Sequence, residues 1–137
     1  MELTNGHQPV TLARESFTGR QLRRMRQLVL AAARGAGLTV QRSYQLVLAV
    51  NEAATNVVKH AGGRGEIEVI QDDGRALIAV ITDQGPGLPS GAVPSRPDIE
   101  ACGGRGLWLI QEVCDRVEVR TGRAGTQVRL EMNLHSG

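Results

Sequence analysis

Apolar and polar positions recur along the chain with periods that predict most of its secondary structure. Residues 9–16, PVTLARES, alternate weakly, which is typical of an edge strand. Thr18 is then a favourable N-cap for a helix over residues 21–37, which ends at glycines. The positions expected on the packed face of this helix are Leu22, Met25, Val29 and Ala32 or Ala33, and those expected on its exposed side are Arg20, Arg23, Arg24 and Arg26.

A second helix is predicted from about Val40 to Ala61. Its predicted apolar stripe comprises Val47, Val50, Ala54, Val57, Val58 and Ala61. At about 100° per residue, Glu52 and Asn56 lie roughly 160° from Ala54. We therefore expect both polar side chains to point away from the packed face of this helix.

The rest of the chain predicts two hairpins around one further helix. The strand-like runs GEIEVIQ and RALIAVIT flank Asp72-Asp73-Gly74, and RVEVRT and TQVRLEMN flank GRAG. Between the hairpins, residues 88–103 contain three prolines and are expected to be a functional loop, followed by the helical sequence GGRGLWLIQEVCD. This order predicts an α+β fold, a two-layer sandwich with a mostly antiparallel mixed sheet and helices on one face.

Composition narrows the function classes. The 137 residues match one domain, and the single Phe, Trp and Tyr imply an aliphatic core that does not read nucleic acid by stacking. The net charge is only +2, although residues 1–36 carry six Arg against two Glu. No apolar run reaches the roughly 20 residues of a membrane span, residues 1–10 resemble no signal peptide, and the two cysteines lack C-x-x-C spacing. We expect a reduced, cytoplasmic protein with a flexible N-terminus.

An apolar strand ends in the sequence ITDQGPG, residues 81–87. A carboxylate at the end of a buried strand requires hydrogen-bond donors, and the amino group of adenine is one candidate partner for Asp83. Gly85 and Gly87 would allow the backbone to approach a flat or charged ligand. Taken alone, this pattern also fits an ordinary turn.

Two further patterns suggest phosphate and metal chemistry. Gly104 and Gly106 precede a helix, whose first backbone N–H groups and dipole favour phosphate, although a simple tight turn has the same composition. Glu52 and Asn56, one helical turn apart, supply oxygen atoms suited to a magnesium-bound phosphate and to an attacking hydroxyl group. The alternative is a solvated helix face. Neither a P-loop nor a dinucleotide fingerprint is present.

Taken in order, NEAATNVVKHA, DQGPG, a loop with prolines, GGRGL and GTQVRL resemble the ATP-binding (Bergerat) domain of the GHKL group, named for gyrase, Hsp90, histidine kinase and mismatch-repair proteins. Within this group the chain most resembles the small bacterial anti-sigma-factor serine/threonine kinases, from about Phe17 to Leu134. The resemblance implies a single ATP-binding domain over residues 1–137, with residues 88–103 as the ATP lid. This lid is short and lacks the basic residues that some relatives carry.

The resemblance also implies roles for individual residues. Asn56 would bind Mg²⁺, Glu52 would act as general base, and Asp83 would hold the adenine amino group. The other implied nucleotide-binding positions are Gly85, Gly87, Gly104, Arg105, Gly106, Leu107 and Thr126. Arg105 could instead contact a bound protein, and His60 is expected to be structural.

The function that the resemblance implies is phosphorylation of an anti-sigma-factor antagonist with Mg-ATP, with exchange of that partner for a sigma factor. The alternative is a nucleotide-binding module that sequesters a regulatory protein without turnover. Relatives often form dimers, so a homodimer through the arginine-bearing helix or the first strand is a further expectation. Direct binding of nucleic acid by that helix is the weakest hypothesis, because its four exposed arginines are few.

Overall fold

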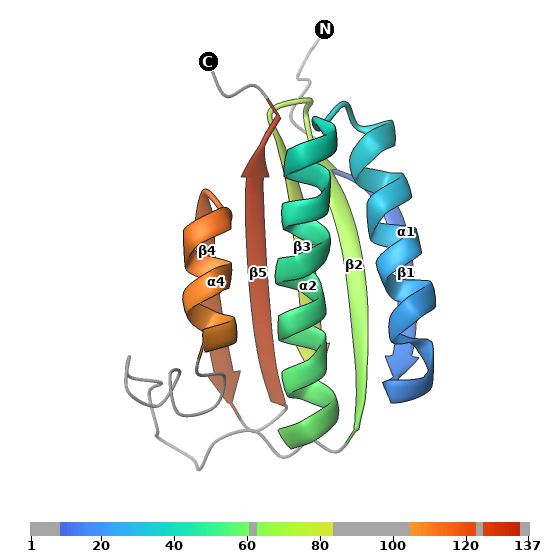
Figure 1. Ribbon diagram of the computed structural model, residues 1–137, viewed down its shortest axis with the longest axis vertical. Coiled ribbons are helices and arrows are strands. Elements are labelled where there is room, and N and C mark those ends of the chain that lie inside the picture. The colour runs from blue at the N-terminus through green and yellow to red at the C-terminus, as the bar shows by residue number, and fades with distance from the viewer. Residues whose placement is uncertain (1–8, 61–62, 84–104, 123–124, 135–137) are drawn as a thin grey trace, which may run out of the picture.

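The structure, a computed structural model, describes residues 9–60, 63–83, 105–122 and 125–134 (Figure 1). The predicted flexible N-terminus and the predicted lid, residues 88–103, lie outside this part of the chain. The elements are β1 (Pro9–Thr18), the short 3-10 helix η1 (Gly19–Gln21), α1 (Leu22–Gly35), α2 (Val40–His60), β2 (Arg64–Asp72), β3 (Ala76–Asp83), α4 (Arg105–Val113), β4 (Arg116–Gly122) and β5 (Gly125–Asn133).

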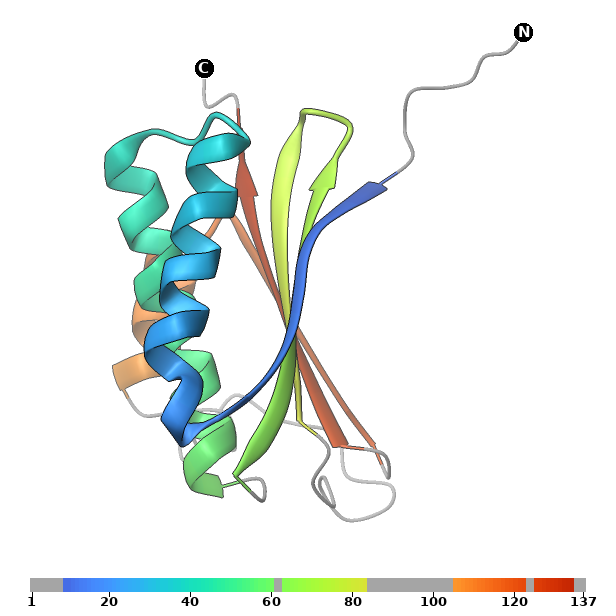
Figure 2. The same ribbon diagram turned by 90° about the vertical axis from the view of Figure 1, so that its right-hand side faces the viewer.

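Five strands form one sheet in the order β1-β2-β3-β5-β4, and the helices cover one of its faces (Figures 1 and 2). Helix α2 lies between α1 and α4. The predicted two-layer α+β sandwich is therefore confirmed. One detail differs, because every described strand pairing is antiparallel and the sheet is not mixed.

The first strand and helix follow the predicted pattern. Strand β1 is an edge strand, and the Thr18 hydroxyl accepts a hydrogen bond from Arg20 N while Gln21 Oε1 accepts one from Thr18 N. This capping box starts η1, which leads into α1. Helix α1 buries Met25, Val29 and Ala33. Arg26, predicted on the exposed side, is instead half-buried, because it reaches across to α2.

Helix α2 packs on a face that is rotated from the predicted one. Thr39 caps the helix by accepting a hydrogen bond from Arg42 N at 3.2 Å. The buried apolar positions are Leu46, Ala49, Val50, Ala53, Ala54 and Val57, whereas Val47 and Val58 are only partly buried. Glu52 and Asn56 are consequently half-buried on a flank of the packed face, so the expectation that they point away from it is only partly right.

Local turn chemistry explains the β2–β3 hairpin. Arg75 N donates to Asp72 O at 2.9 Å, and the two residues between them, Asp73 and Gly74, have φ values of 53° and 68°. Positive φ at both central positions is the requirement of a type I′ turn, whose twist matches that of the flanking strands. The predicted hairpin is confirmed, as is the closing hairpin of β4 and β5.

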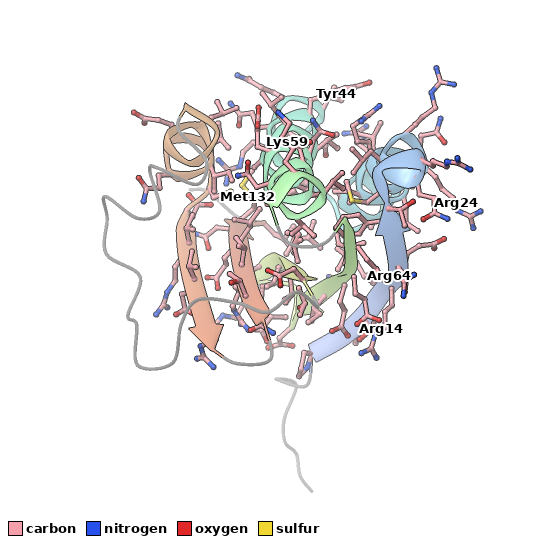
Figure 3. All side chains as sticks on the ribbon, turned by 90° about the horizontal axis from the view of Figure 1, so that it is seen from below. Arg14, Arg24, Tyr44, Lys59, Arg64 and Met132 are labelled. Carbon is pink, nitrogen blue, oxygen red and sulfur yellow. The ribbon has the colours of Figure 1, made fainter. Side chains whose placement is uncertain are left out.

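The core lies between the sheet and the helices and is aliphatic, as expected. Among the described side chains of the core, Phe17 is the one large aromatic. Met132, on β5, points toward the helices (Figure 3). The strands contribute the fully buried side chains Ile67, Val69, Leu77, Ala79, Ile81, Leu130 and Met132. No helix in the described part of the chain has both the length and the apolar character needed to cross a bilayer.

Cys114 lies directly after α4 at the edge of this core and is 8% exposed. Burial raises the pKa of its thiol from 9.0 to about 12; the neighbouring Asp115 carboxylate adds to the increase and Arg42 opposes it. The folded protein therefore holds this thiol proton at pH values at which the unfolded chain releases it.

This difference predicts a loss of stability at high pH. Because the unfolded state binds fewer protons than the folded state above pH 9, the free energy of unfolding falls as the pH rises from 9 toward 12. The contribution of Cys114 to the free energy of unfolding should be about 1 kcal/mol smaller at pH 10 than at pH 8. Urea denaturation at both pH values measures it, with Cys114→Ala as the control. An equal decrease in both proteins would contradict the prediction.

Candidate functional site

Asp83 is the last residue of β3 and continues the row of side chains that faces the helices. Leu77, Ala79 and Ile81, at every second position before it, are fully buried in the core. Asp83 is itself only 4% exposed, and Ser43 is the other buried polar residue in the described part of the chain. A carboxylate in this position must be held by hydrogen-bond donors.

The start of β5 holds the Asp83 carboxylate. Thr126 N donates a hydrogen bond to Asp83 Oδ2 at 3.1 Å. The preceding Gly125 has a φ of 124°, and a Cβ atom there would lie 2.4 Å from Asp83 O and 2.8 Å from Asp83 Oδ1. Only a glycine allows the backbone of β5 to come this close to the carboxylate. We refer to Asp83, Gly125 and Thr126 as the clasp.

Replacement of Gly125 by alanine should open the clasp. The added Cβ would displace Asp83, and the positive φ would add strain of about 1–3 kcal/mol. We expect a lower melting temperature and at least about tenfold weaker ATP binding. The matched control is Gly37→Ala, since Gly37 has a φ of 97° and nothing within 4 Å of its Cβ position. The same ATP affinity in both variants, measured by calorimetry, would exclude the clasp from the site.

Gly65, at the start of β2, is a position that the sequence did not single out. It pairs with Asp83 across the sheet, and an added Cβ would lie 2.7 Å from Phe17 Cζ and 3.0 Å from Thr82 O. The absence of a side chain lets Phe17 pack against the backbone beside Asp83. An isolated glycine in a strand is the sequence signal for such a close approach.

The two flanks of α2 face different neighbours. On one flank, Asn51 Oδ1 accepts a hydrogen bond from Arg26 Nη1 of α1 at 2.9 Å. Around the helix axis, Glu52 is about 100° and Asn56 about 140° from Asn51. This rotation passes the outward side of the helix, so both residues lie on the other flank. Because α2 lies between α1 and α4, this second flank faces α4 (Figure 1).

Helix α4 begins at the same end of the molecule as the clasp. Arg105, Gly106 and Leu107 form its first turn, which contains no acidic residue. The first backbone N–H groups of a helix have no partner inside it, and the dipole favours an anion there. These groups are therefore suited to phosphate.

The structure thus brings three of the predicted segments to one end of the molecule: the second half of α2, the clasp and the start of α4 (Figures 1 and 2). This end therefore combines a buried carboxylate acceptor, an amide and a second carboxylate on a helix flank, and a helix N-terminus. A nucleobase, a metal-bound phosphate and an attacking hydroxyl group require groups of these kinds. Gly85, Gly87 and Gly104 lie outside the described residues. Among the described residues, no group of three or more His, Cys, Asp or Glu could hold a metal ion.

Comparisons with known proteins agree with this arrangement. The sequence model of a family described as "Histidine kinase-like ATPase domain" matches residues 16–132. Among solved structures, the protein is similar to the histidine kinase domain from the Erythrobacter litoralis EL346 blue-light activated histidine kinase, with a TM-score of 0.58 and 20% sequence identity. The similarity covers 85% of this chain and 60% of that one, and at this identity it shows the fold alone. No curated protein gives a significant match.

Proposed function

Since the chain belongs to the histidine kinase-like ATPase family of the GHKL superfamily, we propose that it is a serine/threonine protein kinase that transfers the γ-phosphoryl group of Mg-ATP to a small regulatory protein. Membership itself gives the coarser function, an ATPase or kinase domain that binds ATP, generally with Mg²⁺. The observation that most supports ATP as the ligand is the clasp, which fixes a buried carboxylate at the end of β3.

In this proposal Asp83 accepts a hydrogen bond from the adenine amino group. The hydrogen bond from Thr126 N and the contact with Gly125 hold the carboxylate in place before adenine binds. Binding therefore costs little conformational entropy of the Asp83 side chain. Gly85 and Gly87 would complete the adenine site. A carboxylate selects adenine over guanine, because guanine presents a carbonyl oxygen in place of the amino group.

Asn56 would hold the Mg²⁺ ion, which neutralises charge on the phosphates when bound. The first turn of α4, with Gly104, Arg105, Gly106 and Leu107, would hold the phosphates through backbone N–H groups. Glu52 lies one turn before Asn56 on the same flank of α2, and it would accept the proton of the attacking hydroxyl group.

The proposed protein substrate is a serine- or threonine-bearing anti-sigma-factor antagonist, and the alternative partner is a sigma factor held inactive. The support for these partners is the resemblance of the ordered motifs from residue 51 to residue 130 to those of the small anti-sigma-factor kinases. Exchange between two protein partners would make transcription depend on the nucleotide that is bound.

Transfer of radioactive label from γ-labelled ATP to a candidate antagonist tests the proposal. The experiment uses the full chain, Mg²⁺ and the antagonist, with a second antagonist whose acceptor serine is replaced by alanine. Label on the first antagonist alone supports the kinase. Tight binding of the antagonist without label would instead assign the chain to nucleotide-dependent modules that sequester a regulator.

A further inference from the structure

An apolar stripe lies on the outward side of the first half of α2. Val40, Tyr44 and Leu48 are 52%, 58% and 46% exposed, and their spacing of four residues places them on one side of the helix. Figure 3 shows Tyr44 pointing away from the sheet. A helix on the surface of a soluble protein normally carries polar residues on this side. These three residues therefore form a surface that nothing in the described part of the chain covers.

Two guanidinium groups of α1 stand at the ends of this stripe. Arg34 Nη1 donates to Leu38 O at 3.2 Å, two residues before Val40, and Arg26 Nη1 donates to Asn51 Oδ1 at 2.9 Å, three residues after Leu48. Both acceptors are neutral, so these hydrogen bonds orient the guanidinium groups without neutralising their charge. Neither group forms an ion pair with a described residue.

The surrounding helices are strongly basic. Residues 19–60 contain seven basic side chains and one acidic one, Glu52. Arg24 is paired with Glu15 at 3.0 Å and Arg42 with Asp115, and these two ion pairs account for part of the charge. Of the others, Arg26 and Arg34 stand at the ends of the stripe, whereas the start of α1 with Arg20 and Arg23 lies beside the second half of α2. An occupant of this surface should therefore be apolar in its centre and acidic at its edges.

We propose that the stripe is a docking site for an acidic amphipathic helix of a protein partner. Two apolar residues of that helix, three or four positions apart, would pack on Tyr44 and Leu48. Carboxylates near its two ends would pair with Arg34, whose acceptor Leu38 O lies just before α2, and with Arg26, whose acceptor Asn51 lies past the middle of α2.

A second copy of the chain fits this surface poorly. A symmetric contact would bring two arginine-bearing α1 helices close to one another, and like charges would then oppose association. The surface occupies the first half of α2, whereas the candidate nucleotide site uses the second half. The docking proposal consequently does not depend on kinase activity.

The probe for this site is a synthetic amphipathic peptide of about 18 residues, with leucines at helical spacing and glutamates on its other positions. Titration into the isotopically labelled protein should shift the amide resonances of Val40, Tyr44 and Leu48 and the side-chain resonances of Arg26 and Arg34. The control peptide carries lysine in place of glutamate and should bind at least about tenfold more weakly. Equal binding of both peptides, or no binding at millimolar concentration, would overturn the proposal.

A pair of variants distinguishes binding at this site from nonspecific hydrophobic binding of the peptide. Tyr44→Ser with Leu48→Ser should weaken binding of the acidic peptide at least about tenfold, since central apolar contacts dominate such interfaces. The matched control is Val10→Ser with Leu12→Ser, because these residues of β1 are 58% and 39% exposed and the nearby Arg14 is already paired with Glu66. This control should bind the peptide normally.

Two outcomes would assign the stripe to another occupant and so overturn the proposal. One is concentration-dependent dimerisation of the protein that Tyr44→Ser with Leu48→Ser abolishes, which would assign it to a second copy. The other is binding to anionic lipid vesicles that the same variant abolishes, which would assign it to a membrane surface. Both variants should keep the wild-type melting temperature and ATP affinity, and this check establishes that they are folded.

Discussion

Replacement of Glu52 by glutamine should reduce phosphoryl transfer to the protein substrate by about 10²-fold or more, while the ATP dissociation constant stays within about twofold of the wild-type value. Glutamine has nearly the same size as glutamate, so the packing of this flank of α2 should be kept. The side chain would lose the ability to accept a proton, however. Single-turnover transfer from γ-labelled ATP measures the first quantity, and calorimetry measures the second.

The matched control for this variant is Glu66→Gln. Glu66 pairs with Thr82 on β3, next to Asp83, and therefore lies at the same end of the molecule. The alternation along β2 places it on the open face of the sheet, away from the helices, where it forms an exposed ion pair with Arg14. Loss of this negative charge should leave transfer unchanged. Unchanged transfer in Glu52→Gln would refute the assignment of Glu52 as general base.

Replacement of Asp83 by asparagine should weaken ATP binding by about 10- to 100-fold, which is the effect of losing a hydrogen bond to a charged group. The asparagine carbonyl oxygen can still accept a hydrogen bond from Thr126 N. The asparagine amide nitrogen then faces the adenine amino group, and both are donors. The substitution should also reduce discrimination between ATP and GTP, because the guanine carbonyl oxygen can accept from that amide.

Calorimetric titration of the wild-type protein and of Asp83→Asn with ATP and with GTP measures both changes in affinity. The control is Asp73→Asn in the β2–β3 turn. A melting temperature within a few degrees of the wild-type value would show that the fold is kept. ATP affinity within twofold of wild type in Asp83→Asn would contradict the role of Asp83 in adenine recognition.

The sequence predicted those parts of the fold that depend on local chemistry. Thr18 and Gln21 form a capping box within four residues, and Asp73-Gly74 determines its hairpin through the φ angles of two residues. Such features need no knowledge of the rest of the chain. They are the reason that the element order and the fold class could be predicted.

The orientation of α2 could not be predicted in the same way. This helix carries apolar residues on more than one side, since Leu46 and Val50 face the core while Tyr44 and Leu48 face solvent. A periodicity argument gives equal weight to both sets, and tertiary packing decides between them. The predicted face was therefore rotated, and the outward stripe was not recognised as a surface.

The clasp was predictable only through the family resemblance. Asp83 and Thr126 are 43 residues apart, and their hydrogen bond follows from the antiparallel pairing of β3 with β5. Strand order is a long-range property that no local pattern encodes. The steric role of Gly125 follows from this pairing, and it was visible only in the structure.

The most direct test of the central claim, that α2, β3 and β5 converge on one adenine nucleotide, is a crystal structure of the protein with Mg²⁺ and a non-hydrolysable ATP analogue. The predicted result places the adenine amino nitrogen within about 3 Å of an Asp83 carboxylate oxygen and the Mg²⁺ ion within about 2.1 Å of the Asn56 side-chain oxygen. A nucleotide bound elsewhere, or bound at this end of the molecule with neither contact, would contradict the claim.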